Sequence, residues 1–248
     1  MQIWLYTILS VVVVSLISLV GIFTISLSRE KLNKVLIYLV SFSAGTLLGD
    51  AFIHLIPESY ARNGNETLVS VSILSGIAIF FVLEKFVHWR HCHKIACDNH
   101  PHPFSYVILT GDTIHNLIDG LIIGASYSVS IPVGIATTIA VIFHEIPQEV
   151  GDFGSLIYSG FSRSRALFLN FMTALSAILG VLIILVLGEN EKIVNFLVPF
   201  AAGGFIYVAS VDLIPELHKY TEIKKSFWQL ITFILGIGLM MLLLVIFE

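Results

Sequence analysis

Residues 112–152 read DTIHNLIDGLIIGASYSVSIPVGIATTIAVIFHEIPQEVGD, a pair of apolar segments that are both polar at their centres. The polar residues are of kinds that bind metal ions, namely His115, Asn116 and Asp119 in the first segment and His144, Glu145, Gln148 and Glu149 in the second. Ionisable groups inside segments this hydrophobic are expensive and need a partner or a function. This stretch therefore decides both the fold and the chemistry that we expect.

Helical spacing predicts that these polar groups converge. Residues four apart share one face of a helix, which pairs His115 with Asp119. The same spacing pairs His144 with Gln148. If the two segments form an antiparallel pair that turns near Ser130, the two histidines lie equally far from the turn. Four metal-ligand side chains then meet near the middle of the membrane.

The composition is that of an integral membrane protein. Of the 248 residues, 56% are hydrophobic and 12% are charged, with a mean hydropathy of +0.93, whereas a soluble domain has about 25% charged residues. A spanning helix needs about 20 mostly apolar residues. This rule predicts one all-α transmembrane domain over residues 1–248, with eight spans near residues 3–27, 35–57, 67–87, 104–127, 132–159, 165–187, 193–215 and 226–247. The first span lacks a basic leader, so we expect it to be retained.

The positions of Lys and Arg predict the orientation. The loops after spans 1, 3, 5 and 7, or the edges of those loops, hold Arg29, Lys31, Lys34, Lys85, Arg90, Lys94, Arg163, Arg165, Lys219, Lys224 and Lys225. The remaining loops hold only Arg62 and Lys192. Because basic loops stay on the cytosolic side, both termini are expected to be extracytoplasmic. The expected membrane is a plasma membrane or a bacterial inner membrane.

An internal repeat relates the two ends of the chain. FSAGTLLGDAFIHLIPE (residues 42–58) aligns without gaps with FAAGGFIYVASVDLIPE (residues 200–216). These stretches lie in spans 2 and 7, which run in opposite directions. The pattern predicts an inverted repeat of spans 1–3 and 6–8 around a central pair of spans 4 and 5, as in many transporters. Chance similarity between apolar helices is the alternative.

Further polar residues predict a path on either side of the central pair. The expected path residues are His54, Asp50, Glu149, Asp112, Asp152 and Asp212. Since spans 2 and 7 are antiparallel, His54 lies near the outer face and Asp212 near the inner face. Ordinary helix ends in headgroup water are the alternative for these two. Asp112 and Asp152 either orient the ligands, form an exit path or are solvated at a vestibule.

Small residues and one proline predict local packing. Gly45 with Gly49, and Gly120 with Gly124, have the GxxxG spacing that lets membrane helices approach closely. Pro147 lies inside span 5, where its missing N–H frees the carbonyl one turn earlier, at position 143. We expect the helix to bend there, beside the ligands.

The types of ligand limit which metal ions the site can bind. Imidazole and carboxylate together suit Zn²⁺, Fe²⁺, Mn²⁺ or Cd²⁺, whereas the lack of thiolate and thioether argues against Cu(I). The expected ligands are His115, Asn116, Asp119, His144, Glu145 and Gln148. The alternative is a polar network that only stabilises helix packing.

A loop between spans 3 and 4 is rich in His and Cys. The stretch HWRHCHKIACDNHPH, residues 88–102, contains His88, His91, Cys92, His93, Cys97, His100 and His102. Such a composition indicates metal binding, although the spacing fits no standard zinc finger. We expect a transient cytosolic acceptor or sensor with reduced thiols; an inert polar loop is the alternative.

Several function classes are excluded or left as alternatives. HEIPQ resembles the H-E-x-x-H motif of zinc proteases, but Gln148 replaces the second His and a proline interrupts the motif. No G-x-S-x-G, P-loop or dinucleotide fingerprint is present. We therefore expect a transporter and not an enzyme. An intramembrane zinc hydrolase and a divalent cation channel with a carboxylate filter remain the competing hypotheses.

With these motifs the sequence resembles the ZIP (Zrt/Irt-like) family of metal transporters. The matching pieces are HNLIDG, HEIPQEVGDF, GDAFIHLIPE, ASVDLIPEL and the His-rich loop. The resemblance implies uptake of divalent metal toward the cytosol through a two-metal site. It assigns the first ion to His115, Asp119, His144 and Gln148, and the second to Asn116 and Glu145, with Asp119 shared.

The motif HEIPQE is similar to the LIV-1 branch of that family, whose usual form has His at the position of Gln148. This departure leaves the metal preference open. The resemblance does not extend to the large histidine-rich extracellular domain of many members. The expected partners are divalent metal ions, with Zn²⁺ first, and the lipid bilayer. A homodimer stays open, and nucleic acid is not expected.

Overall fold

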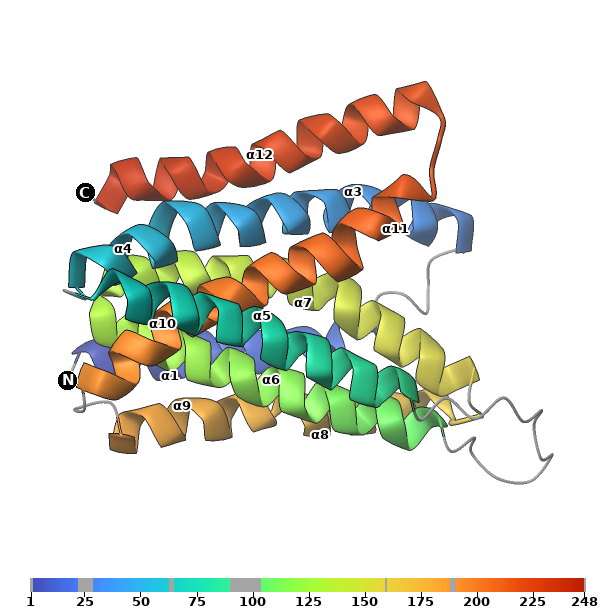
Figure 1. Ribbon diagram of the computed structural model, residues 1–248. Coiled ribbons are helices and arrows are strands. Elements are labelled where there is room, and N and C mark those ends of the chain that lie inside the picture. Colours follow the sequence, from blue (N-terminus) through green and yellow to red (C-terminus); the bar gives the residue numbers. More distant parts are fainter. Residues whose placement is uncertain are drawn as a thin grey trace.

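The computed structural model describes residues 2–21, 29–62, 65–89, 104–158, 160–187 and 191–247, and its regular structure in these ranges is helical (Figure 1). The α-helices are α1 (Gln2–Ile17), α3 (Arg29–Gly49), α4 (Ile56–Arg62), α5 (Glu66–Trp89), α6 (Phe104–Val129), α7 (Ile131–Tyr158), α8 (Arg163–Ala174), α9 (Ser176–Leu187), α10 (Glu191–Tyr207), α11 (Ile214–His218) and α12 (Ile223–Phe247). A short 3₁₀ turn, η1 (Ser18–Val20), follows α1. The expected all-α class is confirmed for the described residues.

Two π-helical segments interrupt the α-helices. The segment η2 (Asp50–Leu55) joins α3 to α4, and η3 (Val208–Leu213) joins α10 to α11. Each occupies the same place in its copy of the repeated stretch, directly before the sequence IPE. A π-helical turn changes which way the following side chains point and is most often found at functional sites.

Seven of the described helical stretches are long and apolar enough to cross a membrane. They are Ile3–Val20, Leu36–Arg62, Glu66–Lys85, Ile131–Gly154, Arg163–Leu187, Glu191–His218 and Ile223–Ile246. Helix α6 is not among them, although its 26 residues are enough to span a bilayer. The polar residues at its centre, His115, Asn116 and Asp119, lower its hydropathy. The protein is an integral membrane protein with helical spans.

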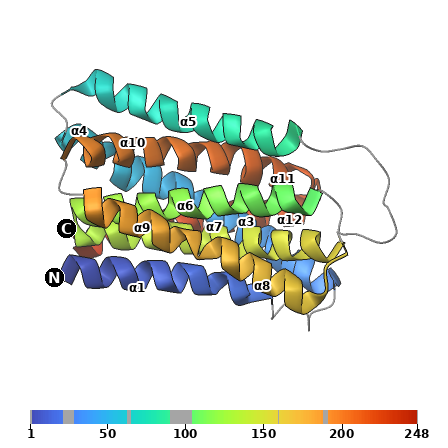
Figure 2. The same ribbon diagram turned by 90° about the horizontal axis from the view of Figure 1, so that it is seen from below.

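Close helix crossings hold the bundle together. Helix α3 packs on α12 (Figure 1), and α5 packs on α10 (Figure 2). A Cβ built on Gly45 would lie 2.2 Å from the carbonyl oxygen of Phe233, and one on Gly203 would lie 2.0 Å from that of Ile73. Neither contact leaves room for a side chain. The predicted role of Gly45 in packing is therefore confirmed.

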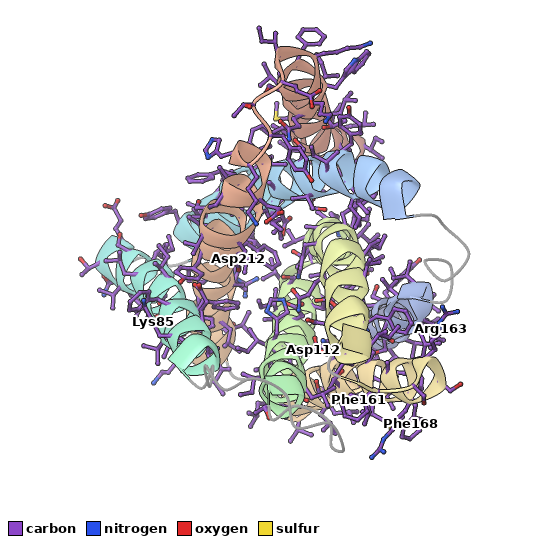
Figure 3. All side chains as sticks on the ribbon, turned by 90° about the vertical axis from the view of Figure 1, so that its right-hand side faces the viewer. Lys85, Asp112, Phe161, Arg163, Phe168 and Asp212 are labelled. Atoms are coloured by element: carbon purple, nitrogen blue, oxygen red, sulfur yellow. The ribbon has the colours of Figure 1, made fainter. Side chains whose placement is uncertain are left out.

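Helices α6 and α7 lie at the centre of the bundle. Helix α6 packs on both α7 and α9, and α1 packs on α7. Helices α5 and α1 lie on opposite sides of this pair (Figures 2 and 3). The first residues of α1 and the last residues of α12 lie at the same end of the bundle, which we call the terminal end (Figure 1). The opposite end, where α6 begins and α7 finishes, we call the loop end.

Candidate metal centre

A tight hairpin sets the register of α6 and α7. The amide of Ser130 donates to the carbonyl of Ser126 at 3.2 Å, and the hydroxyl of Ser130 accepts from the amide of Val133 at 3.3 Å. This second bond caps the start of α7. A Cβ on Gly134 would meet the ring of Tyr127 at 2.3 Å, so glycine lets the two helices approach closely here. The predicted antiparallel pair with its turn at Ser130 is confirmed.

The hairpin brings four ligand-type side chains together as the central cluster, which consists of His115, Asp119, His144 and Glu145. One ligand atom of each lies within 4.8 Å of the others. The Nε2 atom of His144 is 3.3 Å from Nε2 of His115, 3.2 Å from Oδ2 of Asp119 and 3.4 Å from Oε1 of Glu145. The Nε2 atom of His115 is 3.5 Å from Oδ2 of Asp119 and 3.6 Å from Oε1 of Glu145.

These five separations match those between the ligand atoms of a tetrahedral metal site. Ligand atoms at about 2.0–2.2 Å from a tetrahedral zinc ion lie roughly 3.3–3.6 Å apart. The side chains of Asp119, His144 and Glu145 are at most 2% exposed, whereas that of His115 is 17% exposed. Two imidazoles and two carboxylates at this spacing can hold Zn²⁺ or a related divalent ion. His115 is the ligand on the more open side.

Neighbouring groups orient the two imidazoles. The Nδ1 atom of His144 lies 3.2 Å from the carbonyl oxygen of Ala140. An N–H on Nδ1 that donates to this carbonyl leaves the lone pair of Nε2 free for a metal ion. The rings of Phe205 and Phe80 pack edge-on against His144 and His115, each with centroids 6.0 Å apart. The imidazoles are thus held before any ion binds.

The two amide side chains of the predicted ligand set are turned toward Asp112. The Nδ2 atom of Asn116 donates to Oδ1 of Asp112 at 2.9 Å and to its carbonyl at 3.2 Å. The Nε2 atom of Gln148 donates to the same Oδ1 at 3.5 Å. Asp112 therefore organises both amides one turn from the central cluster, on the side of the loop end.

Asn170 on α8 is a polar residue that the sequence reasoning missed. Its amide nitrogen donates to the carbonyl of Glu149 at 3.2 Å and also to the Glu149 carboxylate. Both side chains are fully buried. The signal was present, because Asn170 is a lone amide in the apolar run LFLNFM. No local pattern showed that it would face Glu149.

The carbonyl that Pro147 frees has found another donor. The hydroxyl of Ser43, on α3, donates to the carbonyl oxygen of Phe143 at 2.5 Å. The rings of Phe42 and Phe143 also pack edge to face, with centroids 4.6 Å apart. The proline thus creates a contact between α7 and α3 immediately before the central cluster.

A second buried polar group lies between the central cluster and the terminal end. Asp50 on η2 accepts a hydrogen bond from the hydroxyl of Thr137 at 3.0 Å, and Nδ1 of His54 lies 3.2 Å from its Oδ1. His54 also lines a cavity of about 380 Å³ with Glu58, Ser130 and residues of α12. Its lining residues Ser130 and Pro132, at the α6–α7 turn, place this cavity at the terminal end.

The remaining predicted residues are spread along the chain. Asp152 is half-buried near the loop end of α7, and Asp212 is exposed on η3. His91, Cys92, His93, Cys97, His100 and His102 lie outside the described residues, as does the side chain of His88.

Known proteins share this pattern over most of the chain. The family model described as ZIP zinc transporter matches residues 1–106 and 102–244. Zinc transporter zipt-7.1 of Caenorhabditis briggsae is 30% identical, over 97% of this chain and 79% of the relative. The zinc transporter ZIP13 homolog of Drosophila melanogaster is 31% identical, over 99% of this chain and 90% of the relative. Zinc transporter YKE4 of Saccharomyces cerevisiae is 32% identical, over 87% of this chain and 72% of the relative.

Proposed function

The chain belongs to the ZIP zinc transporter family, and from this premise we propose that it carries a divalent metal ion, zinc foremost, across a membrane through the central cluster. The observation behind this proposal is the spacing of four ligand atoms within 4.8 Å of one another inside the helix bundle. Ionisable groups inside a membrane are costly and commonly mark the path of an ion. The family members matched by the chain are transporters and not enzymes, which removes the hydrolase hypothesis.

The ligand set of the first ion includes Gln148 in this proposal. Its amide nitrogen faces Asp112, so its carbonyl oxygen is the atom left to contact an ion. A second ion bound by Asn116 and Glu145, with Asp119 shared, is part of the same proposal. Support for it comes from Asn116, whose Oδ1 atom is buried and accepts no hydrogen bond within the described residues.

The path of the ion is proposed to run from the terminal end to the loop end. The cavity beside His54 admits the ion, and the Asp50–His54 pair passes it inward toward the central cluster. Asp112, Glu149 and Asp152 follow on the loop-end side, and Asp212 lies at the inner mouth. With the basic loops in the cytosol, this direction is uptake, and both chain termini are extracytoplasmic.

We also propose eight spans related by an inverted repeat. Three observations support it. Helix α6 runs alongside α7 and is long enough to span the membrane, and η2 and η3 occur at matching positions of the repeat. In addition, helices of the first half pack against helices of the second half. The two helices that carry the repeated stretch behave alike: α3 packs on α12, and α10 packs on α5. The two halves of the scaffold then face opposite sides of the membrane.

The His/Cys loop, residues 88–102, is proposed to receive or sense metal that leaves the path. Its composition supports the proposal. Replacing its His and Cys residues by Ser should change regulation or loading more than the maximal rate of uptake.

Uptake by purified protein in proteoliposomes tests the central proposal. Zinc entry should fall at least about tenfold in His144→Ala, because this residue contacts the other three ligands of the cluster. His218→Ala is the matched control, since His218 is exposed on α11, far along the chain from the cluster. Normal uptake by a well-folded His144→Ala variant would overturn the role of the cluster.

A further inference from the structure

We propose an additional cation-binding site, distinct from the two ions proposed above and made only of oxygen ligands, between the central cluster and the loop end; it rests on the proposed transport function. Its residues are Asp112 on α6, Glu149 on α7 and Asn170 on α8, and we call it the inner oxygen site. The three helices pack on one another in pairs. Each therefore contributes one side chain to the same buried region.

The charges of this region are not balanced by the protein. The side chains of Asp112 and Glu149 are buried, at 4% and 1% exposure. The charged groups that act on Glu149 are Asp112, Glu145 and Asp152, all acidic, and those that act on Asp112 include His115. No Lys or Arg within the described ranges forms an ion pair with either carboxylate. In Figure 3 the labelled Lys85 and Arg163 lie at the edges of the bundle, whereas Asp112 lies near its centre.

The hydrogen bonds of this region leave several acceptor oxygens without a donor. The amide nitrogen of Asn170 is bound to Glu149, and that of Asn116 is bound to Asp112. The oxygens Oε1 of Glu149, Oδ1 of Asn170 and Oδ2 of Asp112 are buried without a hydrogen-bond partner among the residues that the structure describes. Buried polar atoms are nearly always paired. A bound cation would satisfy these unpaired oxygens and neutralise the two buried carboxylates.

The ligand chemistry indicates which cation. Carboxylate and amide oxygens suit hard divalent ions such as Mn²⁺ and Mg²⁺, whereas imidazole favours Zn²⁺. The inner oxygen site thus differs from the central cluster, which offers two nitrogens. A zinc ion that leaves the histidines would be held less tightly here, which favours its release toward the loop end. A Mn²⁺ ion would stay longer at this site than at the central cluster.

Manganese binding to purified protein tests the site apart from transport. Electron paramagnetic resonance counts free Mn²⁺ in a titration of the detergent-solubilised double variant His144→Ala/Glu145→Ala, which lacks a ligand of each of the two ions proposed above. We expect one Mn²⁺ to remain bound. Adding Asn170→Ala should weaken this binding about tenfold, whereas Asn170→Asp, which supplies a third carboxylate, should strengthen it about tenfold.

Ser176→Ala is the matched control. The hydroxyl of Ser176 donates to the carbonyl of Thr113 at 2.7 Å, so the variant removes a buried bond between α9 and α6 and leaves the carboxylates intact. It should not change Mn²⁺ binding. Equal binding after adding Asn170→Ala, Asn170→Asp or Ser176→Ala to the double variant would overturn the inner oxygen site. The loss of all Mn²⁺ binding in the double variant itself would overturn it as well. Failure of the wild type to transport zinc, with Mn²⁺ binding as expected, would instead overturn the proposed function.

Discussion

Gln148 shows how much depends on a single residue. It stands where the LIV-1 pattern has His, and it lies one turn after His144 on α7. Its amide nitrogen faces Asp112 at 3.5 Å, so its oxygen is the atom available for an ion. An amide oxygen is a harder ligand than an imidazole nitrogen. If this oxygen contacts the ion, we expect the site to tolerate Mn²⁺ better than it would with a histidine at position 148.

Replacing Gln148 by His should therefore sharpen the preference for zinc. We expect excess Mn²⁺ to inhibit zinc uptake about tenfold less in Gln148→His than in the wild type, because a third imidazole favours Zn²⁺ over Mn²⁺. Competition uptake in proteoliposomes measures this. Gln148→Ala separates the gain of an imidazole from the loss of the amide. Identical competition curves for the three proteins would show that residue 148 does not contact the ion.

At the scale of the element, α7 depends on a bond from another helix. Pro147 cannot donate to the carbonyl of Phe143, and the hydroxyl of Ser43 on α3 does so instead. The contact lies one residue before His144. A hydrogen bond from α3 thus replaces the backbone hydrogen bond that α7 lacks. It links α3 to the helix that carries two residues of the central cluster.

A double-mutant cycle should reveal this repair. Ser43→Ala leaves a buried acceptor unpaired and should lower the free energy of unfolding by about 1–3 kcal/mol. In Pro147→Ala the backbone N–H of residue 147 returns and can satisfy Phe143, so the same Ser43→Ala change should cost less than about 0.5 kcal/mol. Unfolding in detergent micelles measures both. Additive effects would mean that Ser43 acts independently of the proline.

The crossing of α3 and α12 depends on the absence of a side chain at Gly45. Gly45→Ala places a methyl group against the backbone carbonyl of Phe233, which cannot move aside as a flexible side chain would. We expect a loss of about 1–3 kcal/mol in stability from this overpacking. Gly238→Ala is the matched control on α12, because its Cβ would meet nothing within 4 Å. A thermal unfolding midpoint that falls equally in both variants would contradict this account.

At the scale of the whole molecule, the orientation in the membrane can be read from the native cysteines. Cys92 and Cys97 are the two cysteines of the chain, and both lie in the His/Cys loop. A membrane-impermeant maleimide added to intact cells should label them only after permeabilisation, because the basic loops are expected in the cytosol. The control replaces both by Ser and adds Glu248→Cys, which should be labelled without permeabilisation. The reverse pattern would invert the proposed direction of transport.

The sequence by itself determined the class of the protein and the meeting of its ligands. Hydropathy over long stretches requires membrane helices, and the spacing of His115 and His144 from Ser130 places them at one depth in any tight antiparallel hairpin. The freed carbonyl of Phe143 also follows from one proline. These conclusions depend only on neighbours along the chain, because helical geometry fixes how such neighbours lie.

Only the tertiary structure determined the hydrogen-bond partners of the buried polar side chains. Asn116 and Gln148 donate hydrogen bonds to Asp112. Asn170 donates to Glu149, and Ser43 donates to the carbonyl of Phe143. Each of these contacts depends on a rotamer or on a helix far away in the sequence. Helical periodicity says which face a residue occupies but not which helix packs against that face. The inner oxygen site could therefore be recognised only after α8 was placed beside α6 and α7.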